Sequence, residues 1–220
     1  MVGRVIKSVT AKDDSLIFAN PLTSESFVNT LENRKVTSVS QHGKYFWAQL
    51  DNDKFVLLHF GMTGWIHVKG KKTHFIVMEN GGDKKAKERL AQLADSKSTK
   101  SVNSDNMGEE DDPDMVWPPK FDKFILTTDS DQQLAFTDPR RLGRVRIIDA
   151  KNEDELMKLD PLRKNGLDFS KPDGRWDQDT FAAEVSRRKV PAKSLLLDQA
   201  LFAGVGNWIA DEILYQARIQ

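Results

Sequence analysis

Two glycines and an asparagine near the carboxyl end of the chain are the residues whose types and spacing best suit chemistry. Gly204 and Gly206 separate an apolar stretch from Asn207, where a second stretch of helical spacing begins. Glycine permits a tight turn and a close approach of the backbone to a ligand. The amino end of the following helix would present N–H groups and the positive end of its dipole, which suit an anion such as a DNA phosphate. On these residues alone, a helical hairpin with ordinary glycine caps is the alternative explanation.

The spacing of apolar residues predicts the helices that must hold these glycines. It indicates a helix over residues 192–203 that stops at Gly204, and a second helix with Asn207 as its N-cap. Phe181 and Val185, four residues apart, indicate another helix upstream. Residues 151–174 hold two prolines and two glycines and are expected to form a linker. Residues 175–220 are therefore expected to form a helical domain.

The first 150 residues have the pattern of short β-strands. Runs rich in Val, Phe, Trp and Thr are separated by turn signals, which predicts an antiparallel sandwich or barrel. One helix is expected after Ser24 as N-cap, with Phe27, Val28 and Leu31 on one face. The expected strands are residues 35–41, 44–50, 54–60, 64–69, 121–127, 132–137 and 144–149. The sequence thus predicts an α+β protein, with an N-terminal antiparallel β-sandwich over residues 1–150 followed by the helical domain.

Composition excludes several classes of protein. The chain of 220 residues carries 33 Lys and Arg against 33 Asp and Glu, so it does not coat nucleic acid by net charge alone. It has no cysteine, which excludes disulfides and Cys-based metal sites, and no apolar run of about 18 residues to span a membrane. The charge is uneven, because residues 102–115 hold six acidic residues and no basic one. The surrounding stretch, about residues 80–119, is too polar to fold and is expected to be a disordered insertion, a solvated loop without function being the simplest interpretation.

Four segments in order resemble the formamidopyrimidine-DNA glycosylase (Fpg) and endonuclease VIII family, in a form most similar to its plant and fungal branch. Any one alone would be a weak signal, but together they span most of the chain. The segments are QHGKY at 41–45, HFGMTG at 59–64, TDPRRLG at 137–143 and GNWIADEILYQARI at 206–219, which resembles a helix–two-turns–helix.

The resemblance implies a protein that flips an oxidised base out of duplex DNA. Met62, Arg140 and Leu142 would fill the hole left in the stack, and Lys44 and Asn207 would bind phosphate beside the lesion. The implied DNA-binding residues are Lys44, Met62, Arg140, Arg141, Leu142, Lys193 and Asn207, and Lys44 and Glu212 are candidates to support catalysis. From the residues alone, the alternatives are core packing for Met62, an exposed helix position for Glu212, and a solvated helix face for the basic residues 187–189.

Three features differ from the family pattern. Leu142 stands where the family has Phe, and leucine stacks less well on a base. Family members begin with Pro-Glu, and the proline amine attacks the sugar C1′ to form a Schiff base. This chain begins with Met1 and Val2, so no catalytic residue is identified, and a family core trimmed at both ends is expected, by gene-model error, splicing or gene decay. The family's zinc finger has no counterpart before Gln220, so no metal or other cofactor is expected.

We therefore predict a base-excision-repair glycosylase and abasic-site lyase for oxidised purines such as 8-oxoguanine and formamidopyrimidines. Its partner would be duplex DNA containing oxidised bases or abasic sites, bound by a monomer in the nucleus and without a membrane. Weak or absent catalysis is expected of this chain by itself. A non-catalytic remnant that binds damaged DNA is the alternative. An RNA- or protein-interaction module is a third possibility, against which the upstream β motifs argue.

Overall fold

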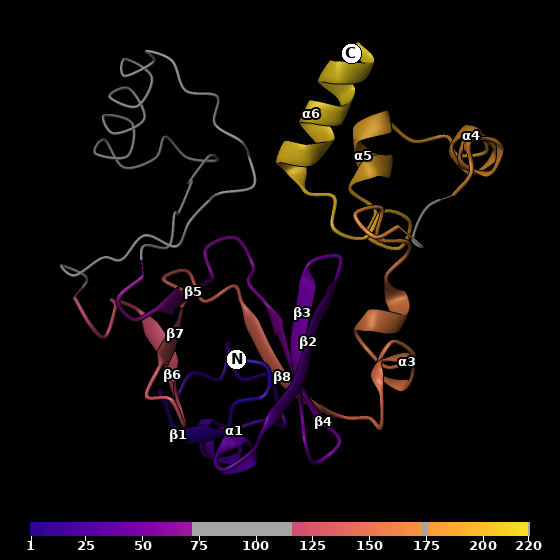
Figure 1. The fold of residues 1–220 in the computed structure, drawn as a ribbon. Helices are drawn as coiled ribbons and strands as arrows, with labels where there is room; N and C mark the ends of the chain where they lie inside the picture. The colour runs from indigo at the N-terminus through magenta and orange to yellow at the C-terminus, as the bar shows by residue number, and fades with distance from the viewer. Residues whose placement is uncertain (72–115, 173–175, 220) are drawn as a thin grey trace, which may run out of the picture.

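The computed structural model describes residues 1–71, 116–172 and 176–219 and has the predicted α+β architecture (Figure 1). Eight strands form two four-stranded antiparallel sheets, with strand orders β1-β6-β7-β5 and β2-β3-β4-β8. The strands are Ile6–Ala11 (β1), Val36–His42 (β2), Tyr45–Leu50 (β3), Lys54–His59 (β4), Trp65–Val68 (β5), Asp122–Thr128 (β6), Gln133–Thr137 (β7) and Arg144–Asp149 (β8). The runs expected from the sequence all form strands. β1 was not predicted, because its residues are mostly polar or exposed.

Two loops, at residues 60–64 and 138–143, connect one sheet to the other. After β4, residues 60–64 lead into β5 of the second sheet, and after β7, residues 138–143 lead back into β8 of the first. The predicted insertion at about 80–119 falls mostly on residues 72–115, outside the described residues.

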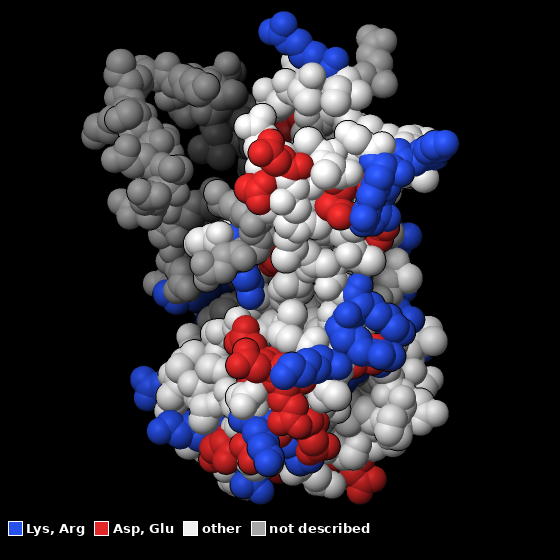
Figure 2. All heavy atoms as spheres, turned by 90° about the vertical axis from the view of Figure 1, so that its right-hand side faces the viewer, with Lys and Arg blue, Asp and Glu red and all other residues white. Residues whose placement is uncertain are grey.

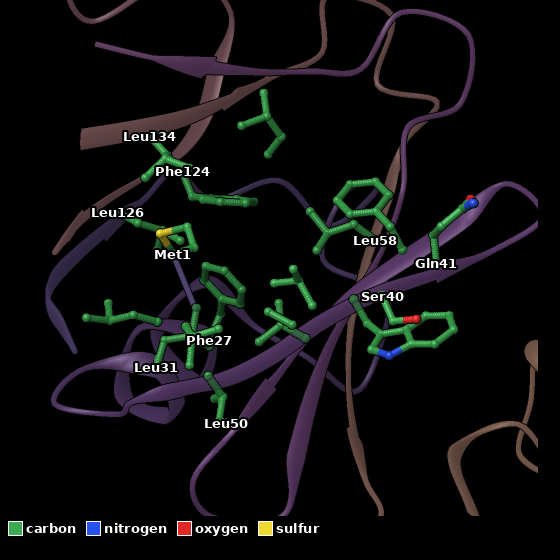
Figure 3. Close-up of a pocket in the computed structure, with 18 residues that line it drawn as sticks. Met1, Phe27, Leu31, Ser40, Gln41, Leu50, Leu58, Phe124, Leu126 and Leu134 are labelled. Carbon is green, nitrogen blue, oxygen red and sulfur yellow. The ribbon is translucent and has the colours of Figure 1, made fainter. Parts of the chain in front are cut away.

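The two sheets enclose an aromatic core that α1 helps to cover. The helix α1 (Ser24–Leu31) buries Phe27 and Leu31, and its N-cap is Thr23 rather than the predicted Ser24, because the Thr23 side chain accepts from the Ser26 N–H. The Phe27 ring packs between Phe18 and Phe124, with centroid distances of 5.1 and 5.0 Å. A cavity of about 490 Å³ remains within the sandwich, and Figure 3 shows its mostly apolar lining, which includes Met1.

The remaining elements are helical and lie beyond one end of the sandwich and along its side (Figure 1). An aromatic cluster packs residues 169–181 against the segment around Phe202, with Phe169, Trp176 and Phe181 each within 6.0 Å of the Phe202 ring centroid. The segment expected as a linker contains two short helices. The elements are α3 (Glu153–Leu156), a 3₁₀ turn (Leu162–Lys164), α4 (Gln178–Ser186), α5 (Ala192–Leu196) and α6 (Asn207–Ala217). None of the helices in the described ranges is both long and apolar enough to cross a membrane.

The prediction of a helix through residue 203 is wrong, because α5 ends at Leu196. Just after α5, side chains form hydrogen bonds with the backbone, where a longer helix would have backbone–backbone hydrogen bonds. Asp198 accepts from the Ala200 N–H at 3.0 Å. The amide of Gln199 donates to the Leu197 and Val205 carbonyls at 2.8 Å and accepts from the Gly204 N–H at 3.1 Å. Such local bonds compete with the helix and shape a turn instead.

Candidate nucleic-acid interface

Strand register brings the sequence motifs to one end of the first sheet. His42 pairs with Tyr45, Tyr45 with His59, and His59 with Arg144. The β2–β3 turn and the loops at 60–64 and 138–143 therefore meet at this end, which faces α5 and α6 (Figure 1).

Hydrogen bonds fasten the β2–β3 turn to the helical part of the chain. The Gly43 N–H donates to Oδ2 of Asp168 at 2.8 Å, and Nε2 of His42 lies 2.8 Å from the Gly166 carbonyl oxygen. Asp168 is buried. Burial acts to raise the pKa of the Asp168 carboxyl, but hydrogen bonds from Ser170 and from the Gly43 N–H outweigh it, so the pKa is lowered. The carboxylate is therefore a charged anchor for the turn.

Two glycines let the turn approach the α5–α6 connection closely. Gly43 has φ of +59° and Gly204 has φ of +98°, conformations that glycine adopts without strain. A Cβ on Gly43 would lie 2.9 Å from Cβ of Ala203 and 3.0 Å from the Gly204 nitrogen. A side chain at position 43 would push the two segments apart.

This approach places Lys44 at the amino end of α6. A Cβ on Gly206 would lie 3.8 Å from Nζ of Lys44. Gly206, not the predicted Asn207, is the N-cap, and it supplies no side-chain cap; Asn207 is the first helical residue. The first turn of α6 has no acidic residue, and its N–H groups have no intrahelical acceptor. Together the ammonium and the helix dipole favour an anion here.

His59 is a residue to which sequence reasoning gave no role. It lines a cavity of about 430 Å³ with Lys44, Tyr45 and Gly61, a volume in the range of small-ligand pockets. Burial lowers its pKa, and the charges of Lys44 and Arg144 lower it further, so the ring is neutral at pH 7. Nδ1 accepts from the Gly61 N–H at 3.0 Å, so Nε2 carries the proton. The larger cavity in the sandwich has a mostly apolar lining without a charged side chain, which does not suit an anion.

The two crossover loops present exposed side chains at the same end. Met62 is 54% exposed, Leu142 is 39% exposed, and Arg140 is also exposed. Apolar side chains of this size are seldom left in water without a partner surface when several gather together. The exposure argues against core packing for Met62.

Arg141 is held against the protein. Its Nε and Nη2 donate to Asp14 at 2.9 to 3.1 Å, and Lys123 donates to the same carboxylate at 2.9 Å. Burial acts to raise the pKa of Asp14, but the hydrogen bonds from Arg141 and Lys123 outweigh it and lower the pKa to about 2. Arg141 thereby anchors the loop at 138–143 to the start of the chain. Sequence reasoning missed Asp14, which lies 127 positions away from its partner.

The structure places the remaining predicted residues on α5 and α6. Lys193 pairs with Asp211 at 2.6 Å. Asp211 follows Asn207 by four residues and so shares its face of α6, which puts Lys193 beside the anion site. Glu212 lies about 140° around the helix from Asn207. It accepts from Gln216, one turn further along, and is exposed.

The basic run at 187–189 is partly neutralised. Arg187 and Arg188 both pair with Glu184 of α4. Figure 2 looks onto the face that carries α3 and α4, where basic and acidic side chains are interspersed. A uniform basic patch therefore does not mark this face. Within the described ranges, no group of three or more His, Asp or Glu residues could hold a metal ion.

Comparison with known proteins decides the family. The family model of the formamidopyrimidine-DNA glycosylase N-terminal domain matches residues 1–145, and that of the formamidopyrimidine-DNA glycosylase H2TH domain matches residues 171–220. The chain belongs to the formamidopyrimidine-DNA glycosylase family. This confirms the resemblance read from the four motifs.

Relatives and solved structures agree with this assignment. A formamidopyrimidine-DNA glycosylase of Arabidopsis thaliana is 31% identical over 221 residues, which cover 99% of this chain and 46% of the relative. One of Paracoccus denitrificans is 27% identical over 217 residues, covering 99% and 61%. The structure of Lactococcus lactis Fpg with abasic-site DNA shares the fold, with a TM-score of 0.67 at 20% identity over 100% of this chain and 63% of that one. The chain spans about half the length of the curated relatives it matches.

Proposed function

We propose that this Fpg-family chain binds duplex DNA at oxidised purines and abasic sites, as part of a base-excision glycosylase and abasic-site lyase. The observation that carries the proposal is the meeting of Lys44 with the uncapped amino end of α6, beside two loops with exposed side chains. An anion site next to apolar wedges suits a nucleic acid whose backbone is gripped while a base leaves the stack.

The anion site fits a phosphate that flanks the lesion. Lys44 supplies a positive charge, and the first turn of α6 supplies N–H donors around Asn207. His59, neutral and with Nε2 protonated, adds a donor that needs no counter-charge. The cavity of about 430 Å³ that Lys44 and His59 line suits the displaced nucleotide.

The exposed residues of the two loops suit the space that a flipped base leaves. Met62 is long and flexible enough to fill an irregular void. Arg140 has a planar fork that can hydrogen-bond the unpaired opposite base. Leu142 can wedge between base steps. These proposed roles account for the exposure of Met62, Arg140 and Leu142 in the unbound protein.

Binding to three fluorescently labelled duplexes tests the proposal. One contains 8-oxoguanine opposite cytosine, one an abasic analogue, and one no damage. We expect a preference of about ten-fold or more for the damaged duplexes, because a damaged or missing base costs less to unstack. Equal affinity for all three, measured by fluorescence anisotropy at fixed salt, would refute the proposed lesion binding.

Borohydride trapping tests the lyase chemistry on the same duplexes. Glycosylase and lyase action through a Schiff base at C1′ would leave a covalent protein–DNA adduct after reduction. Lesion-selective binding without an adduct would favour the alternative, a non-catalytic protein that binds damaged DNA. We also propose a nuclear location, because chromosomal DNA is the substrate; a fluorescent fusion that stays out of the nucleus would contradict this.

A further inference from the structure

Asp138 lies buried between the two crossover loops and bonds both of them. Its side chain is 0% exposed. Oδ1 accepts from the Thr63 hydroxyl at 2.6 Å, which belongs to the loop that carries Met62. Oδ2 accepts from the Gly143 N–H at 2.6 Å, and Oδ1 also accepts from the Arg140 N–H at 3.2 Å. One carboxylate therefore joins loops that are 75 residues apart in sequence.

The loops also meet through their backbones. Gly61 has φ of +63°, and a Cβ there would lie 2.7 Å from the Leu142 carbonyl carbon. Gly143 is also tightly packed, and a Cβ there would lie 3.1 Å from both Oδ2 of Asp138 and the His59 carbonyl oxygen. The two loops are in close contact at Gly61 and Leu142, although Met62 and Leu142 remain 54% and 39% exposed.

We propose that Asp138 is a positioning residue that makes the two loops act as one wedge, so that Met62 and Leu142 enter the duplex together. The inference rests on the proposed function, since it deepens the role of the same loops. A carboxylate suits the task because it accepts several hydrogen bonds at once, and bonds to a charged acceptor are short and strong. Preorganising both loops removes the cost of ordering them separately when DNA binds.

Thr63→Val is the sharpest perturbation, because it removes the hydroxyl that donates to Asp138 and nearly keeps the shape of the side chain. We expect it to weaken binding to the 8-oxoguanine duplex about ten-fold or more, as for loss of a hydrogen bond to a charged group. Binding to undamaged duplex should change less than about two-fold, because the wedge enters only when a base leaves. Thr63→Ser keeps the hydroxyl and should restore lesion binding.

Thr37→Val is the matched control. The Thr37 hydroxyl also donates a hydrogen bond, to the Gln49 carbonyl at 3.2 Å, but it lies at the opposite end of the first sheet. It should leave binding to every duplex unchanged. Asp138→Asn is the second variant, and it should weaken lesion binding at least as much as Thr63→Val, since the amide offers one acceptor fewer.

A double-mutant cycle between Met62→Ala and Leu142→Ala separates coupling from general damage. In the parent chain we expect the double variant to lose less lesion affinity than the product of the single losses, by about three-fold or more. In the Thr63→Val background this coupling should fall below about two-fold, and in Thr63→Ser it should persist.

The outcomes distinguish this inference from the proposed function. If the parent chain shows no preference for lesions, the proposed function fails. If the preference is present and coupling persists undiminished in Thr63→Val, the inference about Asp138 is wrong and the function stands. If Met62→Ala and Leu142→Ala each leave lesion affinity unchanged, the wedge assignment fails and the inference falls with it.

Discussion

Replacing Gly43 by alanine tests whether the close approach of the β2–β3 turn builds the anion site. The new Cβ would lie 2.9 Å from Cβ of Ala203 and 3.0 Å from the Gly204 nitrogen. Neither atom is the end of a flexible side chain, so the turn must move away from the α5–α6 connection. Lys44, the next residue, would leave the amino end of α6.

The loss of stability caused by Gly43→Ala has two parts, which a control variant can separate. Gly43 has φ of +59°, and an alanine forced into this left-handed conformation lowers the free energy of unfolding by about 1 to 2 kcal/mol. The forced contact adds about 1 to 3 kcal/mol, typical of an overpacked site. Gly70→Ala has the first cost only, because Gly70 has φ of +76° and a Cβ there meets nothing within 4 Å. Gly43→Ala should therefore lower the free energy of unfolding more than Gly70→Ala does.

Urea unfolding and DNA binding at several salt concentrations measure both consequences. Loss of one phosphate contact should make the slope of log affinity against log salt shallower by about 0.9 in Gly43→Ala, whereas Gly70→Ala should keep the parent slope. Equal unfolding free energies and equal salt slopes for the two variants would refute the idea that this contact positions Lys44.

Three further predictions concern single side chains. Lys44→Ala should also reduce the salt slope by about 0.9, measured by anisotropy, while Lys151→Ala, just past the opposite end of the same sheet, should not; equal slopes would contradict the anion site. The pKa of Asp14 is about 2 in the folded chain, against an ordinary value of 3.8. The ionised Asp14 carboxylate should therefore add about 2 kcal/mol to the free energy of unfolding. This contribution should be fully present above about pH 4 and lost as the pH falls to about 2. Asp14→Asn should flatten this acid limb in urea unfolding, and an unchanged pH dependence would exclude the role. Leu142→Phe should tighten binding to the 8-oxoguanine duplex about five-fold through better stacking, and weaker binding would argue that Leu142 does not touch a base.

The sequence by itself determined seven of the eight described strands, most of the described helices and the family. Alternation of apolar residues with turn signals is a local property, so the strands from 35 onward could be read directly. The four motifs identified the family because their residue types and their order along the chain can be compared without any knowledge of contacts. The helix expected through residue 203 was wrong for a local reason too: Asp198 and Gln199 bond the backbone in turns, which periodicity alone does not reveal.

Only the tertiary structure decided which residues act together. The family resemblance implied that Lys44 and Asn207 bind the same phosphate region, but the contact that brings them together was not predicted: two glycines, 161 positions apart, allow two turns to touch. Asp14 and Asp138 were missed for the same reason, since a carboxylate in a polar stretch looks like any exposed acid until its donors arrive from distant loops. Residue types fix what each group can do chemically, but burial and long-range hydrogen bonds depend on chain segments that come together only when both sheets and the helices have packed.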